Sequence, residues 1–379
     1  DSGGGAPEVA GMWFKHKETH VRPPLRPLML DFSQHTTVDN NFHRHYLTHK
    51  GKIVRIENGI AKRFLVSNYM TMTSFGCSMR CAYCINNKMK RLYPDWDRVR
   101  RRPVDHIIVE LKDAVNKIPR IWSVDLVDDD FCSAHVEYLE EFRDKYKGEI
   151  GLPLDVMGLR PADVVPEKMD ILRDMGAVKV RMGIQAVNRE AKKLFKRTYS
   201  NKFLMKKVNL LHRYRKDFFG IRYDFIVDTP WDDKTASIDI LKFMSRMPPP
   251  FFANIFTLAF YPGSELYDRA LKERIIEPND VWEGRLNKNF MELKPTWVNF
   301  LLTVMSIVHI SPPVLNMLLR PTFLCRVRPI PTSILKLAQA LVSAKRFLVF
   351  LAHGDRAQLR KVFLYLTEYG FLFRPMKKG

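Results

Sequence analysis

The stretch "SFGCSMRCAYCINN", Ser74 to Asn87, holds three of the five cysteines in this chain of 379 residues. Cys77, Cys81 and Cys84 follow the spacing C-x3-C-x2-C. An odd number of cysteines, mostly clustered, does not fit a disulfide framework and favours a metal or redox role in a reducing compartment. Three thiolates on a four-iron cluster leave one iron without a protein ligand, as an open coordination position for a substrate. The sequence therefore predicts a catalytic metal centre in this loop.

Strand-like and helical segments alternate along the chain around this loop. Six runs rich in β-branched and apolar residues predict strands at 69–73, 121–127, 152–158, 177–184, 220–227 and 254–260. Amphipathic helices are predicted between them at 105–117, 134–147, 167–175 and 201–214. Such alternation is typical of a parallel sheet with helices outside, so we predict an α/β fold with a partial (β/α)6 barrel. Functional residues of such barrels collect in the loops after the strands, where the cysteine loop also lies.

We expect three regions along the chain. Residues 1–66 are predicted to be an irregular, linker-like segment, residues 67–275 the partial barrel, and residues 276–379 a helical, basic and apolar C-terminal region. Two apolar stretches of the last region are short or interrupted by charges, and a membrane span needs about 20 apolar residues. They predict helices packed on the barrel, with basic amphipathic helices at a membrane surface as the alternative.

The net charge of +21 favours anionic partners, which include nucleic acid, phospholipid headgroups and phosphorylated or carboxylated substrates. The run "RVRRRP" at 98–103, with Tyr93 and Trp96 nearby, is a candidate basic stacking patch for nucleic acid. We favour a solvated helix start or a support of the cysteine loop. A non-catalytic nucleic-acid-binding protein is therefore an alternative, and nucleic acid is not the expected partner.

A zinc site with three cysteines and one histidine is the alternative for the cysteine loop. His106 is the nearby histidine, and Cys132 and Cys325 are the other cysteines available as a fourth ligand. Zinc modules usually pair two C-x2-C knuckles, whereas this chain has one. We interpret Cys132 and Cys325 as buried small apolar residues. The spacing therefore favours an iron–sulfur cluster.

With Tyr83 as an aromatic residue before the last cysteine, the loop reads C-x3-C-x-aromatic-C. This motif resembles the radical S-adenosylmethionine (SAM) superfamily, whose members carry it after the first strand of a partial (β/α)6 barrel. The resemblance implies a 4Fe–4S cluster on Cys77, Cys81 and Cys84, with SAM on the open iron. In that family the reduced cluster cleaves SAM to methionine and a 5′-deoxyadenosyl radical, which abstracts hydrogen from the substrate. It further implies a cytoplasmic enzyme with an electron donor such as ferredoxin or flavodoxin.

Sequence segments after the cysteine loop resemble one class of this superfamily in particular. They follow in the order seen in the cobalamin-dependent class, which includes the anaerobic magnesium-protoporphyrin cyclase and the hopanoid and phosphinate methyltransferases. They read "RRRPVDHIIVELK", "VDLVDDDF", "LPLDVMGLRP", "VRMGIQAVN", "RYDFIVDTPWDD" and "FYPGSELYDRA". The class implies methyl transfer or oxidative cyclisation at an unactivated carbon of a small-molecule or lipid-like substrate, with cobalamin as a further candidate cofactor. Because no D-x-H-x-x-G signature precedes the barrel, we expect this chain to lack the N-terminal cobalamin-binding domain.

The resemblance also implies site residues, and these complete our cofactor-binding candidates: Tyr83, Asp128, Asp129, Gln185 and Asp224. Asp128 or Asp129, at the end of the second strand, would accept hydrogen bonds from the SAM ammonium group. Gln185 would bind the SAM carboxylate or ribose. Asp224 lies within the fifth strand. We predict that it faces inward, because a carboxylate is costly to bury in an apolar core where it has no partner. Arg181 is a candidate partner for a carboxylate.

A tRNA-modifying radical SAM methylthiotransferase is the second enzyme hypothesis, and the basic charge suits it. Those enzymes resemble this chain in the barrel, and they carry three further N-terminal cysteines and a C-terminal RNA-binding β-barrel. No cysteine precedes Cys77 here, and the C-terminal region is predicted to be helical. We therefore favour the cobalamin-dependent type.

Overall fold

The computed structural model of the protein describes residues 9–16, 19–32, 37–49, 51–56, 68–118, 121–232, 235–280, 293–320 and 330–354.

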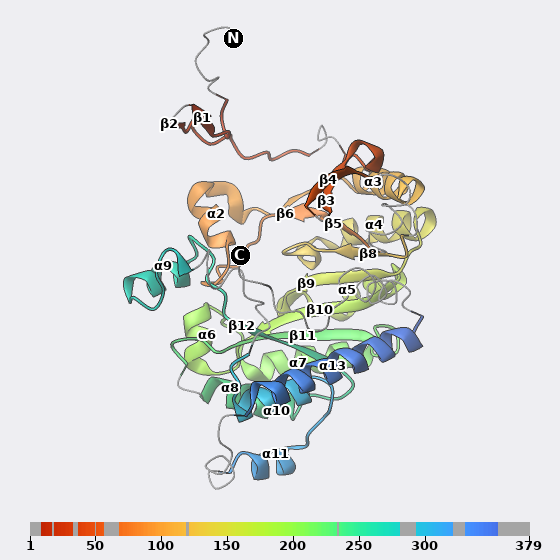
Figure 1. The fold of residues 1–379 in the computed structure, drawn as a ribbon. Helices are drawn as coiled ribbons and strands as arrows, with labels where there is room; N and C mark the ends of the chain where they lie inside the picture. The colour runs from red at the N-terminus through yellow and green to blue at the C-terminus, as the bar shows by residue number, and fades with distance from the viewer. Residues whose placement is uncertain are drawn as a thin grey trace.

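A six-stranded sheet forms the centre of the fold, in the order β12-β11-β10-β9-β8-β5 (Figure 1). All neighbouring strands pair in parallel. Their bounds are β5 Asn68–Thr71, β8 Ser123–Leu126, β9 Leu154–Leu159, β10 Ala177–Gln185, β11 Gly220–Val227 and β12 Phe252–Thr257. Because β5 and β12 are the two edges of this sheet, the barrel is open. The predicted α/β fold with a partial barrel is confirmed, with strand ends shifted by a few residues.

Helices connect the strands and cover one face of the sheet (Figure 1). They are α3 Val104–Lys117, α4 Val136–Glu149, α5 Pro166–Asp174, α7 Asn201–Arg213 and α8 Thr235–Met244. Helix α6 Arg189–Phe195 packs instead against Ala82 of the cysteine loop and Leu266. The four predicted helices correspond to α3, α4, α5 and α7. The Ser200 hydroxyl caps α7 by accepting a hydrogen bond from the Phe203 amide at 3.1 Å.

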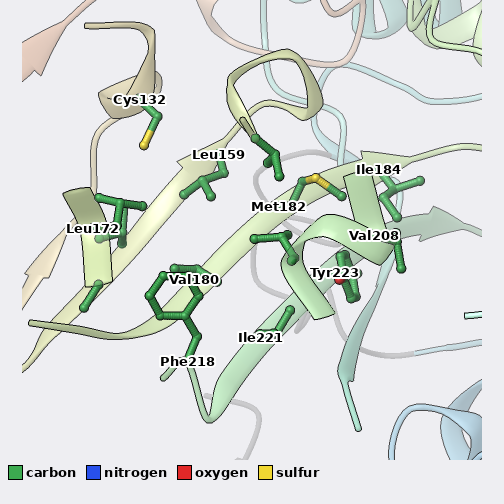
Figure 2. Close-up of a cluster of buried hydrophobic side chains, with 14 of the residues drawn as sticks. Cys132, Leu159, Leu172, Val180, Met182, Ile184, Val208, Phe218, Ile221 and Tyr223 are labelled. Atoms are coloured by element: carbon green, nitrogen blue, oxygen red, sulfur yellow. The ribbon is translucent and has the colours of Figure 1, made fainter. Parts of the chain in front are cut away.

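The two faces of the strands differ sharply. Figure 2 shows the covered face, where Val180, Met182 and Ile184 of β10 pack in a continuous apolar core. The alternate residues of β10, Lys179 and Arg181 among them, lie on the other face, the inside of the open barrel. Strands of parallel sheets are usually apolar on both faces. A charged inner face therefore marks a binding cavity instead of a second packed core.

The cysteine loop is framed by short elements. These are β6 Ser74–Phe75, β7 Arg100–Arg101, α2 Asn86–Leu92 and the 3-10 turn η2 Pro94–Asp97. Two further 3-10 turns follow strands β8 and β9, at η3 Phe131–Ser133 and η4 Pro161–Asp163. Strands β6 and β7 pair antiparallel and close the loop at its base.

The chain ahead of the barrel carries two short antiparallel hairpins. They are β1 Phe14–His16 with β2 Thr19–Val21, and β3 Tyr46–His49 with β4 Lys52–Arg55, preceded by the turn η1 Phe42–Arg44. The rest of the described N-terminal segment is irregular, as the sequence predicts.

The described C-terminal region is helical, again as predicted. It contains α10 Trp297–Met305, α11 Pro312–Leu318 and α13 Thr332–Ala352. Helix α9 Glu265–Lys272 precedes it, at the end of the barrel region. Helix α10 packs against both α8 and α13. None of the helices in the described ranges is long and apolar enough to cross a membrane. These helices are also unlike the β-barrel that the methylthiotransferase hypothesis requires. The remaining parts of the region, Cys325 included, lie outside the described residues.

Candidate cofactor site

A cavity of about 260 Å3 opens on the inner face of the sheet, beside the cysteine loop. It is lined by all the site residues expected from the sequence, which come from the loop and from three strands or strand ends. They are Cys77, Cys81, Cys84, Tyr83, Asp128, Asp129, Gln185 and Asp224. Arg181 also lines it. Residues far apart in sequence therefore meet at the end of the barrel where parallel strands place functional groups.

Backbone hydrogen bonds hold the cysteine loop to the barrel. The Ala82 amide donates to the carbonyl of Phe195 in α6 at 3.3 Å, and the Ala82 carbonyl accepts from the amide of Leu266 in α9 at 3.0 Å. The Asn87 side chain donates to the Cys81 carbonyl at 2.7 Å. The loop is thus fixed at its centre by two helices that follow later strands.

The three thiols are free and suited to metal binding. Cys77 and Cys81 are buried and Cys84 is half-buried. Burial raises the pKa of Cys77 to about 12 and also raises the pKa of Cys84, so a metal is needed to hold them as thiolates.

The donor set fits a cluster better than a single ion. Within the described ranges, no three His, Cys, Asp or Glu side chains converge on one metal position. In a four-iron cluster each thiolate binds a different iron, so such convergence is not required. For the zinc alternative, His106 does not line the cavity and Cys132 is fully buried in the apolar core. Neither can serve there as a fourth ligand.

The two neighbouring acids Asp128 and Asp129 have different environments. Asp128 is 2% exposed and accepts hydrogen bonds from the Thr73 amide at 3.0 Å, the Thr73 hydroxyl at 2.7 Å and the Ser74 hydroxyl at 2.6 Å. Burial raises its pKa. Asp129 is exposed and accepts from the Asn86 side chain at 3.0 Å. Asp128 therefore fixes the start of the cysteine loop, and Asp129 keeps free acceptor capacity toward the cavity.

Gln185 ends β10 in an unusual backbone conformation. Its φ is 70°, in the left-handed region that few non-glycine residues adopt, and the pairing of β10 with β11 shifts register there. Residues in such conformations cluster at binding sites, because the surrounding structure must hold them in place. The conformation is consistent with a ligand-binding side chain.

Asp224 faces inward as predicted, and it has partners. Both of its oxygens accept from Arg181 Nε, at 2.9 and 2.7 Å, and Oδ1 also accepts from the Asn254 side chain at 2.8 Å. Arg346 of α13 in turn donates to Asn254 Oδ1 at 3.1 Å. Burial lowers the pKa of Arg346 to about 10. The C-terminal helix thus supports the cavity through two side chains that sequence reasoning missed.

Two further arginines line the cavity and were also missed. Arg160 Nε lies 2.8 Å from Asp130 and 2.6 Å from Asp163, and burial, opposed by Arg160, raises the pKa of Asp130 to about 6. Arg197 is 7% exposed and donates to Cys81 Sγ at 3.4 Å and to the carbonyl of Gly183. Its Nε has no hydrogen-bond partner among the described residues. A buried cation beside the cysteines is a ready-made partner for an anionic group. No sequence pattern marks Arg197, which follows α6.

Gly158 lets the neighbouring turn approach β9. Its φ is +77°, and an added Cβ would lie 2.2 Å from the Asp128 carbonyl oxygen. Gly158→Ala is expected to displace this turn and lower the free energy of unfolding by about 1–3 kcal/mol, measured by urea unfolding. Gly148→Ala is the control, since a Cβ there meets nothing within 4 Å, and we expect stability to be unchanged or raised. Equal stability of the two variants would contradict the close approach of Gly158 to the Asp128 carbonyl.

Part of the chain matches a known protein family. Residues 71–236 match the family described as the Radical SAM superfamily. A search of curated proteins by sequence found no match.

Solved structures of low sequence identity are similar to this chain. The radical SAM methyltransferase TsrM from Kitasatospora setae, with cobalamin and a [4Fe-4S] cluster bound, is 15% identical with a TM-score of 0.51, over 70% of this chain and 49% of that chain. The same enzyme with tryptophan substrate and the SAM analogue aza-SAM is 16% identical over the same shares, with the same TM-score. Coproporphyrinogen III oxidase (HemN) from Escherichia coli is 15% identical over 60% of this chain and 54% of that chain, with a TM-score of 0.43. The chain spans about half the length of these structures. The likeness to TsrM, at an identity this low, shows a common fold only.

Proposed function

Since the chain carries a domain of the radical SAM superfamily over residues 71–236, we propose that Cys77, Cys81 and Cys84 hold its [4Fe–4S] cluster. The observation that carries the proposal is the meeting of the three thiols with Asp129, Gln185 and Arg197 around one cavity. When bound there, the cluster supplies the electron that cleaves SAM reductively. The chain's own side chains bind and orient SAM and exclude water from the reacting atoms.

Each side chain of the cavity then has a distinct proposed task. The Arg197 guanidinium binds the SAM carboxylate, because it is a buried cation beside Cys81 with an unused donor. Asp129 accepts from the SAM ammonium group, because Asp128 is already saturated by Thr73 and Ser74. Gln185 is left to bind the ribose hydroxyls. Asp224, held by Arg181, Asn254 and the α13 helix, keeps the far wall of the cavity in place.

For the reaction we propose methyl transfer or oxidative cyclisation at an unactivated carbon of a small-molecule or lipid-like substrate. The fold shared with the methyltransferase TsrM supports this choice, and its bound cobalamin supports cobalamin as an added cofactor. None of the described residues is assigned to cobalamin. Residues 67–275 would form the catalytic unit, flanked by residues 1–66 and 276–379, with an electron donor such as ferredoxin or flavodoxin.

Arg197 provides a test of the binding mode that does not require turnover. Arg197→Met in the reconstituted protein is expected to weaken SAM binding about 10- to 100-fold, the effect of losing a charge-assisted hydrogen bond in a buried site. Arg197→Lys keeps the charge, so its affinity for SAM is expected to lie between those of wild type and Arg197→Met. Isothermal titration calorimetry with SAM, under anaerobic conditions and at matched iron content, measures the change.

Arg189→Met is the matched control for this experiment. Arg189 is exposed in the neighbouring α6 and does not line the cavity, so SAM affinity should stay at the wild-type value. Wild-type affinity in Arg197→Met would instead show that another group binds the carboxylate.

A further inference from the structure

A second cavity, of about 320 Å3, lies at the opposite end of the strands. Its walls include Ile221 and Phe252, which stand at the starts of β11 and β12, together with residues that follow α10 and the last turns of α13. It shares no lining residue with the cofactor cavity. The function proposed above gives this cavity no role, and the chemistry of its lining is independent of that function.

The floor of this second cavity is aromatic. Phe218, Phe219, Phe251 and Phe252 all line it, and so does Met305. The Phe219 ring stacks on His353 with centroids 4.6 Å apart. The volume lies near the lower end of small-molecule sites, which span about 300–1,000 Å3 and are mostly apolar with a few polar groups. The floor therefore suits the flat apolar body of a small ligand.

The rim of the cavity is basic. Arg215, His309, Lys345 and His353 line it, and none of the described lining residues is an aspartate or glutamate. Lys345 Nζ donates to the Ile307 carbonyl at 2.9 Å, and Arg215 Nη1 donates to the His212 carbonyl at 3.2 Å.

These hydrogen bonds leave the charge of the rim uncompensated. Carbonyl acceptors supply no negative charge, and each of the two cations retains further donors. An aromatic floor under an unneutralised basic rim is complementary to an organic anion, whereas a neutral ligand would leave the rim unused.

We propose that this cavity is a binding site for a small aromatic acid. The ring of the ligand lies against Phe218 and Phe219, and its acid group accepts hydrogen bonds from Lys345 and Arg215. The site is formed jointly by the barrel and by α13, so the ligand would stabilise the docking of this C-terminal helix.

Two fluorescent probes with the same body test the proposal on the full chain. 1-Anilinonaphthalene-8-sulfonate carries one negative charge, and N-phenyl-1-naphthylamine is its neutral counterpart. The double variant Arg215→Gln/Lys345→Gln is expected to weaken binding of the anionic probe about tenfold, equivalent to ~1.4 kcal/mol, and to leave the neutral probe unchanged. Val349→Trp, which fills the cavity without removing a charge, is expected to abolish binding of both.

Lys336→Gln is the matched control, because Lys336 is exposed on the same helix and does not line the cavity. It should leave both affinities unchanged, and thermal unfolding of each variant monitors folding. Unchanged binding of the anionic probe in the double variant would overturn the proposal, and so would an equal loss for both probes there. Equal binding of the neutral probe to Val349→Trp and wild type would place the probe elsewhere and overturn it as well.

Discussion

Cys81→Ala is expected to abolish retention of a four-iron cluster after anaerobic reconstitution with iron and sulfide. Cys81 lies at the centre of the loop that Phe195 and Leu266 hold in place, and its thiol faces the cavity beside Arg197. Two remaining thiolates leave two irons without a protein ligand, and such a cluster is readily lost. Iron and sulfide analysis with the visible absorption spectrum measures the effect, with wild-type protein expected to hold four irons per chain.

Cys132→Ala is the control for that experiment. Cys132 is fully buried in the apolar core and does not line the cofactor cavity. The variant should bind as much iron as wild type and lose only a little stability, as for a small apolar truncation. Loss of iron in Cys132→Ala together with its retention in Cys81→Ala would reverse our assignment of the ligands.

Glu110→Ala is expected to lower the free energy of unfolding by about 3–5 kcal/mol, because it leaves a buried cation unpaired. Glu110 is 1% exposed and lies 2.5 Å from Arg102, whose side chain is 9% exposed. It also accepts hydrogen bonds from the hydroxyls of Thr71 at 2.8 Å and Tyr69 at 3.2 Å. Helix α3 is thus tied through one carboxylate to β5, the strand that leads into the cysteine loop. Urea unfolding measures the change.

An exposed ion pair of similar geometry serves as the comparison. Lys112 of the same helix lies 2.5 Å from Glu149, with side chains 50% and 38% exposed. Glu149→Ala should cost less than about 1 kcal/mol, since water screens such pairs. The double variant Arg102→Met/Glu110→Ala should recover part of the loss, because no unpaired charge remains. If Glu110→Ala and Glu149→Ala lowered the free energy of unfolding by similar amounts, the burial of the Arg102–Glu110 pair would be contradicted.

The repeating parts of the fold were predictable because their signals are local. Each strand of the sheet combines an apolar face with short length, and each predicted helix has apolar residues at helical spacing. Strand β11 has the predicted bounds, Gly220–Val227. Helices α6 and α8 were not predicted, since α6 is short and α8 follows a proline- and aspartate-rich loop with no clear periodic start.

The cofactor cavity was predictable in part. Its cysteines follow a spacing that appears in eight consecutive residues, from Cys77 to Cys84. The difference between Asp128 and Asp129 was not predictable, because it depends on which carboxylate Thr73 and Ser74 contact. Arg197 and Arg346 were missed for the same reason. A basic residue after a helix or within an amphipathic helix usually faces water, and only the tertiary structure brings these two inward.

The most direct test of the central claim is the formation of 5′-deoxyadenosine by the anaerobically reconstituted protein. The protein is incubated with SAM and dithionite, with and without cobalamin, and the product is measured by liquid chromatography and mass spectrometry. We predict that wild type forms 5′-deoxyadenosine and that Cys81→Ala, at equal protein concentration, forms none. A wild-type protein that binds zinc in place of iron, or a Cys81→Ala variant that forms as much product as wild type, would contradict the account.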